Sequence, residues 1–274
     1  PQVMERILAI VEDPRSGARD LERILSRDPA LTARILRLAN SAYYALPQHV
    51  SSLNQAIVIL GFGTVRAVAL TVSVFDTFPG AGEAVFDRVA FWRHSICSAA
   101  IYRALASKVG GVDVEEAFVS GMLHDVGKLL LDRYAPDLLQ RIVQGAWTRK
   151  CSFLEAERSE ADADHAALGA LLLERWRLAP AVCEWVRDHH AVDAPAGGGA
   201  SDSLRAAISH FSDYLCKVKG VVASGSHDVA HLNRSTWERL GLEKRDIPDV
   251  IEKVNREIET LDTFMSLAPS AARA

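Results

Sequence analysis

The chain has 274 residues, of which 49% are hydrophobic and 24% are charged. This composition is typical of a globular protein with a buried core, arranged as one large domain or two smaller ones. The net charge of −4 and the dispersed basic residues argue against a membrane partner and disfavour a nucleic-acid partner.

Four cysteines lie far apart and form no Cys-x-x-Cys pair: Cys97, Cys151, Cys183 and Cys216. This spacing predicts reduced, mostly buried thiols in a cytoplasmic protein. The first residues mix charged and apolar side chains and lack the apolar run of a signal peptide. The apolar stretch from Gln55 to Asp76 has Arg66 at its centre and breaks at Gly61-Phe62-Gly63, so it predicts two core helices and no membrane span.

Apolar residues recur with helical period along nearly the whole chain, and no convincing alternating run indicates a strand. The sequence therefore predicts an all-α protein. Asp28-Pro29 is typical of a helix start. Ser52 begins a capping box that opens a helix, and Gly61 can close it. Thr64 is expected to cap the next helix, which runs to about Phe78.

An internal boundary is expected at Pro79 to Gly82, where proline and glycine interrupt the helical pattern. Later helices are expected around Phe86–Val109, Val114–Leu131, Pro136–Thr148, His165–Arg177, Pro180–His189 and Leu204–Lys217. The tail from Ser235 onward predicts two further amphipathic helices. We therefore divide the chain into an N-terminal helical lobe (1–80), a core (83–220) and a C-terminal helical tail that packs on the core (221–274).

The placement of the histidines carries the information about chemistry. His124-Asp125 lies near the end of a predicted helix, and two adjacent residues on a helix point about 100° apart. Both side chains can reach one metal only at close range, or each can serve one of two metals. Lys128 lies three residues past Asp125 on the same side, well placed to hold a substrate anion or an acidic ligand.

The order of histidines and aspartates resembles the HD superfamily of metal-dependent phosphohydrolases, and is most similar to its HD-GYP branch. The ordered positions are His94, His124, Asp125, His165, His189, His190 and Asp213. The first third resembles an HDOD domain in Ala39-Asn40-Ser41-Ala42-Tyr43-Tyr44 and in Leu60-Gly61-Phe62-Gly63-Thr64-Val65-Arg66. Phe91-Trp92-Arg93-His94-Ser95 and Gly121 to Lys128 are also similar to that domain. The resemblance implies an all-α fold, with an N-terminal helical lobe packed on an HD core, and a bacterial signalling role.

The resemblance also implies that these seven side chains bind metal. It favours two divalent transition metal ions, iron ahead of manganese, nickel or zinc, with Asp125 as the bridging carboxylate. Ala90 stands where some HD-GYP relatives carry a Glu for a third metal, so two metals are favoured over three. No Gly-Tyr-Pro element follows His190, which argues against cyclic di-GMP hydrolysis. Asp162 or Asp164 could orient a ligand imidazole, although helix capping explains Asp164 equally well.

Two functions fit this pattern. The first is a metal-dependent phosphohydrolase for a nucleotide, cyclic nucleotide or other phosphodiester, with Asp125 and Lys128 in catalysis. Lys128 and Arg93 would bind phosphate, although a surface salt bridge is the alternative for Arg93. The second is a non-catalytic signalling module in which the metals are structural or sensory. In that case the N-terminal lobe recruits a signalling protein.

Overall fold

The computed structural model describes residues 17–40, 49–78, 86–191, 200–221 and 231–259. Within these ranges the chain forms helices and turns and contains no strand, so the predicted all-α class is confirmed. No described helix is long and apolar enough to span a bilayer. All four cysteines are free thiols, and Cys97, Cys183 and Cys216 are buried as expected. The predicted boundary at Pro79 to Gly82 lies outside the described residues.

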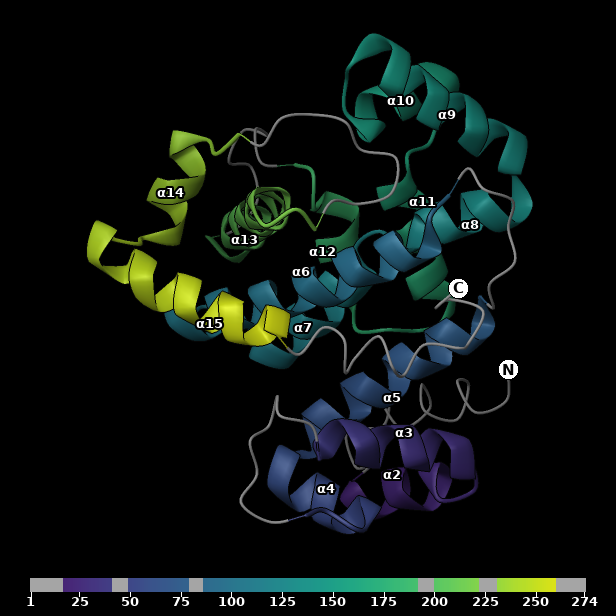
Figure 1. Cartoon of the computed structure of the whole chain (residues 1–274), viewed down its shortest axis with the longest axis vertical. Coiled ribbons are helices and arrows are strands. Elements are labelled where there is room, and N and C mark those ends of the chain that lie inside the picture. Colours follow the sequence, from purple (N-terminus) through teal and green to yellow (C-terminus); the bar gives the residue numbers. More distant parts are fainter. Residues whose placement is uncertain (1–16, 41–48, 79–85, 192–199, 222–230, 260–274) are drawn as a thin grey trace.

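The first helices gather at the lower end of the molecule in Figure 1. They are α2 (Ala18–Leu25), α3 (Pro29–Ala39), α4 (Leu53–Leu60) and α5 (Phe62–Thr77). Asp28 caps α3 as predicted, because its Oδ1 accepts from the amide of Leu31 at 2.9 Å. The prediction that Thr64 caps the next helix is wrong, because α5 begins at Phe62. Gly61, at φ 86°, ends α4 and begins α5 by itself, because its left-handed conformation turns the chain within one residue.

The second group of helices surrounds α6, which runs through the middle of the molecule (Figure 1). It comprises α6 (Arg88–Val109), α7 (Val114–Leu123), α8 (Val126–Tyr134), α9 (Pro136–Arg149), α10 (Phe153–Glu160), α11 (His165–Arg175), α12 (Pro180–Asp188) and α13 (Ala200–Val218). The single helix expected over Val114–Leu131 is wrong, because the chain breaks at His124-Asp125 into α7 and α8. The sequence analysis did not predict α10.

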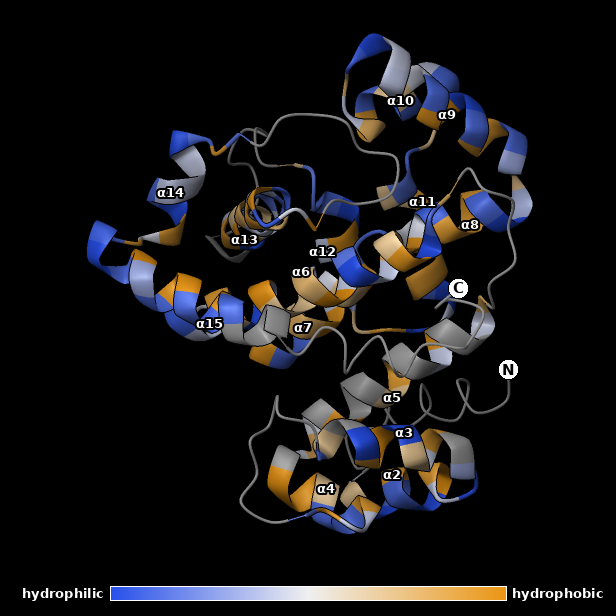
Figure 2. Ribbon diagram, viewed as in Figure 1, coloured by the Kyte–Doolittle hydropathy of each residue, from blue (hydrophilic) through white to orange (hydrophobic). Residues whose placement is uncertain are grey.

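The tail adds α14 (Arg234–Leu240), the short 3-10 helix η1 (Lys244–Asp246) and α15 (Ile247–Glu259). α15 packs against α6, and α14 packs against α13. Gly241 ends α14 in the left-handed conformation. In Figure 2 apolar residues concentrate where α6 and α7 cross the middle of the molecule, whereas α14 at the rim is mainly hydrophilic.

The side chain of Arg88 joins the end of α5 to the second group of helices. The Nε of Arg88, the first residue of α6, donates to Oδ2 of Asp132 in α8 at 2.7 Å. Its Nη1 donates to the carbonyl oxygen of Phe78, the residue that ends α5, at 3.2 Å. Both side chains are at most 10% exposed. Removing the charge of Arg88 would leave the buried carboxylate of Asp132 without this partner, which is costly.

We therefore expect Arg88→Met to lower the free energy of unfolding by about 3–5 kcal/mol, measured by urea denaturation. Arg141→Met is the matched control, because Arg141 pairs with Glu160 at an exposed site and its loss should cost less than about 1 kcal/mol. Arg88→Met combined with Asp132→Leu should recover part of the loss. Equal effects of the two single variants would contradict this account.

Candidate metal centre

The His124-Asp125 pair lies at the break between α7 and α8. His124 keeps helical backbone angles, whereas Asp125, at φ −98° and ψ 6°, departs from them. The two side chains are therefore not held to the divergence of adjacent helical residues, and Nε2 of His124 lies 3.5 Å from Oδ2 of Asp125. Asp125 is only 2% exposed. The break thus places a buried carboxylate where other elements can converge on it.

Four imidazoles from different elements face the two oxygens of Asp125. Oδ2 lies 3.9 Å from Nε2 of His94 in α6, in addition to His124. Oδ1 lies 3.2 Å from Nε2 of His165, the first residue of α11, and 3.8 Å from Nε2 of His189, which ends α12. Each carboxylate oxygen therefore faces its own pair of ring nitrogens. A carboxylate in this arrangement is suited to bridge two metal ions.

The other ring nitrogen of each of these histidines is already engaged. Nδ1 lies near the carbonyl oxygen of Val221 for His94 (3.1 Å), of Gly121 for His124 (2.8 Å) and of Val186 for His189 (2.7 Å), and near Oε2 of Glu157 for His165 (2.6 Å). A carbonyl oxygen can only accept, so Nδ1 donates in the first three cases. These bonds fix the orientation of the rings and leave each Nε2 directed at Asp125.

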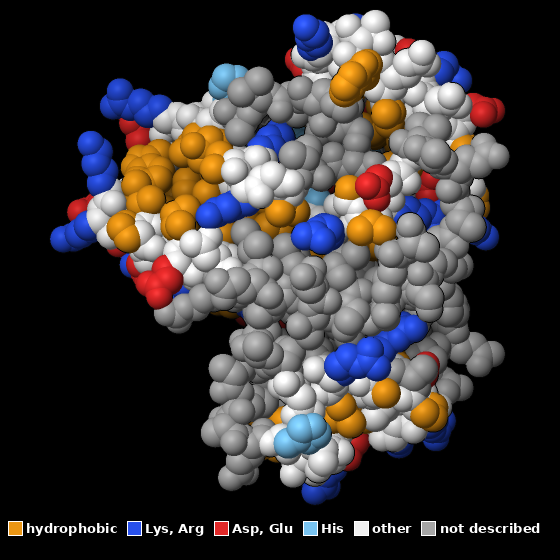
Figure 3. All heavy atoms as spheres, viewed as in Figure 1, with side chains coloured by type: hydrophobic (Ala, Val, Ile, Leu, Met, Phe, Trp, Pro, Cys, Tyr) orange, Lys and Arg blue, Asp and Glu red, His pale blue; other side chains and the backbone are white. Residues whose placement is uncertain are grey.

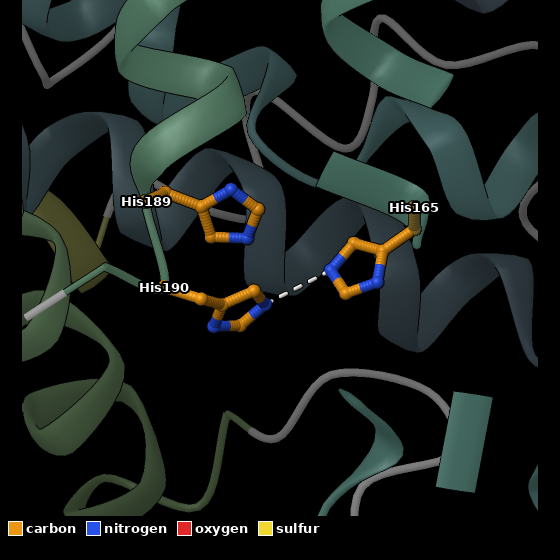
Figure 4. A group of neighbouring side chains, drawn as sticks. All are labelled: His165, His189 and His190. Atoms are coloured by element: carbon orange, nitrogen blue, oxygen red, sulfur yellow. Dashed lines mark hydrogen bonds between the residues drawn. The ribbon is translucent and has the colours of Figure 1, made fainter. Parts of the chain in front are cut away.

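A third histidine joins His165 and His189 on their side of Asp125. Figure 4 shows His165 at the start of α11, with His189 and His190 following α12. The Nε2 atoms of His190 and His165 lie 3.0 Å apart. Two nitrogen ligands at about 2.1 Å from one ion and at right angles would be separated by about the same distance. His190 is partly exposed, and Figure 3 shows histidine surface near the centre of this face of the molecule.

The residues present fit two metal ions. His94, His124 and Asp125 form one group of ligand atoms that lie within 4.8 Å of one another, and His165, His189 and His190 form a second. Nε2 of His189 is buried and has no hydrogen-bond partner. An orphaned buried nitrogen is costly, and a metal ion is a partner that would satisfy it. Mixed imidazole and carboxylate donors suit iron, manganese, zinc or nickel.

Burial and charge set the protonation of the centre. Burial lowers the pKa of His124 to about 3. Burial and the charge of His165 lower the pKa of His189 to about 3 as well, so both rings are neutral. Burial opposes a charge on His94, but Cys216 and nearby carboxylates raise its pKa to about 9. Burial alone would also raise the pKa of Asp125, yet Lys128 and the histidines hold it well below its usual value. Neutral imidazole and ionised carboxylate are the metal-binding forms. His124, His189 and Asp125 already have them, whereas His94 would release a proton when a metal binds.

Lys128 lies inside the centre. Its Nζ donates to Oδ2 of Asp125 at 2.8 Å and lies 4.7 Å from the centre of the Phe153 ring. The side chain is 4% exposed. The sequence predicted that Lys128 would hold either a substrate anion or an acidic ligand, and in the structure it contacts the acidic ligand Asp125.

Six of the seven predicted ligands come together, and Asp213 does not. Oδ2 of Asp213 pairs with Nζ of Lys217 at 2.7 Å, and its side chain is 43% exposed. It lies outside both groups of ligand atoms, although its charge contributes to the raised pKa of His94. Its role as a ligand stays a prediction. Arg93 is exposed on α6 next to His94, and its role in phosphate binding also stays a prediction.

Glu157 is the residue of the centre that the sequence analysis missed. It is fully buried on α10 and accepts from Nδ1 of His165. The sequence analysis had considered Asp162 or Asp164 for this role of orienting a ligand imidazole. Asp164 instead caps α11 by accepting from the amide of Ala167 at 3.0 Å, which was the stated alternative. A usable signal existed at the start of α10, where Ser152 and Glu155 form a capping box.

Gly127 allows the close approach of α8 to α11 that places His165 beside Asp125. A Cβ atom added at Gly127 would lie 2.0 Å from the carbonyl oxygen of His165, a distance that no side chain can adopt. The backbone of His165 therefore sits where any larger residue at position 127 would collide with it. The geometry of the second group of ligands depends on this contact.

Comparison with known proteins identifies relatives of this chain. The family model of the HDOD domain matches residues 1–192. An HDOD domain protein of unknown function from Geobacter sulfurreducens superposes with a TM-score of 0.80 at 24% identity, covering 96% of this chain and 92% of that one. A protein from Shewanella amazonensis SB2B that is named a phosphohydrolase superposes with a TM-score of 0.73 at 25% identity, covering 96% and 93%. An uncharacterised protein of Treponema pallidum is 23% identical over 194 residues, which span 69% of this chain and 37% of that protein.

We expect Gly127→Ala to destabilise the protein by about 3 kcal/mol or more, because the backbone of His165 must move. Gly145→Ala is the matched control. It lies inside α9, and its added Cβ would meet only the end of the flexible Arg149 side chain, so it should be neutral or stabilising by up to about 1 kcal/mol. Thermal denaturation measures both. Similar changes in the two variants would contradict the close contact.

Proposed function

The chain belongs to the HDOD domain family, and we propose that it is a metal-dependent phosphohydrolase acting on a nucleotide, cyclic nucleotide or other phosphodiester. The observation that carries this proposal is the bridging arrangement of Asp125, whose two oxygens each face two imidazoles. The likeness to a Shewanella protein that is named a phosphohydrolase supports the same class of reaction. We place this activity in a bacterial cytoplasmic signalling protein.

The first group of ligands would hold one ion and the second group the other, with Asp125 between them. Of the metals suited to these donors we favour iron, with manganese, nickel or zinc as alternatives. When bound, such ions polarise a phosphoryl oxygen and lower the pKa of water towards neutral pH. His190, which is partly exposed, places one edge of the second group towards solvent and an incoming phosphate.

The chain's own residues would do the rest of the work. Asp125 holds the two halves of the centre together, because no other described carboxylate faces both groups of histidines. Lys128 brings a fixed positive charge next to Asp125 and is placed to stabilise negative charge that develops on a transferred phosphoryl group. Arg93, exposed beside His94, would contact the remainder of the substrate.

A second function is favoured by the surface of the N-terminal helices. None of the described residues of α2 to α5 belongs to either ligand group. In α4, Val58 is 76% exposed and Ile59 is 47% exposed. These features support a signalling module that binds a protein partner through α4 and uses the metals for structure or sensing. In such a module, removing the metals would lower thermal stability although no turnover existed.

To test the hydrolase, we expect protein loaded with Mn²⁺ or Fe²⁺ to cleave bis(p-nitrophenyl) phosphate, and Asp125→Asn to lose more than about 100-fold in rate. That figure is the upper end of the loss caused by removing a hydrogen-bond partner of a ligand, and Asp125 faces both groups directly. Asp162→Asn, at an exposed position, is the control and should keep the rate. Equal rates for wild type and Asp125→Asn would rule out the proposed reaction.

Lys128→Met separates catalysis from metal binding. Without the ammonium group, kcat should fall by about 100- to 1,000-fold. The affinity for Mn²⁺ should stay the same or rise, because a positive charge beside Asp125 has been removed. Steady-state kinetics and a Mn²⁺ titration measure the two effects. A variant that loses metal while its rate per bound ion is unchanged would assign Lys128 a structural role only.

A further inference from the structure

The four histidines that face Asp125 differ in what holds their second nitrogen. For His94, His124 and His189 the partner of Nδ1 is a backbone carbonyl oxygen. For His165 it is the carboxylate of Glu157, at 2.6 Å. A carboxylate on Nδ1 increases the electron donation of the imidazole through Nε2 more than a neutral carbonyl does. The two metal positions are therefore chemically unequal.

The surroundings of Glu157 give a second, independent reason to place a cation near His165. Glu157 is 0% exposed, and its Oε1 has no hydrogen-bond partner. Within the described part of the chain its charged partner is His165, and no lysine or arginine there lies within ion-pair distance. A buried carboxylate with an unpartnered oxygen is costly, and its compensating charge must come through His165, from a proton or from a metal ion. A cation bound at Nε2 of His165 would supply that charge through the ring.

The positive charge of Lys128 opposes a cation near His165. Its ammonium group lies against Asp125 and Phe153, which both contact His165, so it is close enough to repel a further positive charge there. Phe153 also packs edge-on against His165, with ring centres 5.4 Å apart. A metal ion at the second group would therefore meet repulsion from Lys128. Glu157 is the group placed to offset it.

We propose that Glu157 is a positioning residue that makes the group of His165, His189 and His190 the tighter of the two metal positions, and the first to fill. This inference rests on the proposed metal centre but not on its hydrolytic activity. Glu157 acts through His165, whose ring it orients and whose donor strength it raises. The group of His94, His124 and Asp125 lacks such a carboxylate and would fill second.

The test is a titration of the whole chain with Mn²⁺, with free Mn²⁺ followed by electron paramagnetic resonance. Wild type should show a tight and a weaker class of sites. Glu157→Gln keeps the shape of the side chain but removes its charge, and should weaken the tight class by about 10- to 100-fold while leaving the other within about twofold. Glu160→Gln is the matched control, on an exposed position of the same helix. It should titrate like wild type.

Two further variants locate the classes. His165→Ala should abolish the tight class, whereas His94→Ala should retain it. Without added metal, Glu157→Gln should melt close to wild type, because the amide oxygen of Gln can still accept the hydrogen bond from Nδ1 of His165. If Glu157→Gln titrates like wild type, or if both classes weaken equally and the metal-free protein melts at a lower temperature, the proposal is overturned. The same holds if His94→Ala is the variant that removes the tight class.

The outcome also separates this inference from the proposed reaction. If wild type binds no Mn²⁺, both fall together. If wild type binds Mn²⁺ and hydrolyses the phosphodiester, but Glu157→Gln changes neither class, only the role of Glu157 falls. If the two classes respond as expected and no hydrolysis is detected, the role of Glu157 stands and the hydrolytic function falls.

Discussion

The arrangement of the second group of helices follows from one constraint, the burial of the Asp125 carboxylate. A buried carboxylate is stable only where positive or polar groups surround it. Four imidazoles and the ammonium group of Lys128 do so here, and they come from α6, α8, α11 and the ends of α7 and α12. The elements that surround the centre must therefore meet at one point, and their packing is fixed by polar geometry as well as by apolar burial.

The break between α7 and α8 is the structural device that makes this convergence work. In a continuous helix, His124 and Asp125 would diverge, and α8 would continue along the axis of α7. The break turns α8 towards α11, where Gly127 admits the backbone of His165. The same local change thus brings His124 close to Oδ2 of Asp125 and His165 close to Oδ1. The two halves of the centre are coupled through this one turn.

The sequence predicted those features that depend on local pattern. Helical periodicity indicated the fold class, and the order of histidines and aspartates indicated six side chains that meet. It did not predict the break at Asp125, because the apolar period continues through it. It also missed Glu157, whose role depends on α10 folding back over His165 and not on any motif. Asp213 fits the order of ligand types, but that order does not show where its carboxylate points. In the structure the carboxylate pairs with Lys217.

The hydrolase and the signalling module require the same metal centre, so the physical case for the metals does not depend on choosing between them. Nε2 of His189 and Oε1 of Glu157 are buried without hydrogen-bond partners. Both residues contact His165: Glu157 accepts from its Nδ1, and the ring of His189 lies 5.4 Å from its ring, centre to centre. Both costs would fall if a cation were held by His165 and His189, because the nitrogen gains a partner and the carboxylate gains a compensating charge. One bound cation would therefore relieve two buried polar costs at once, in the hydrolase and in the signalling module alike.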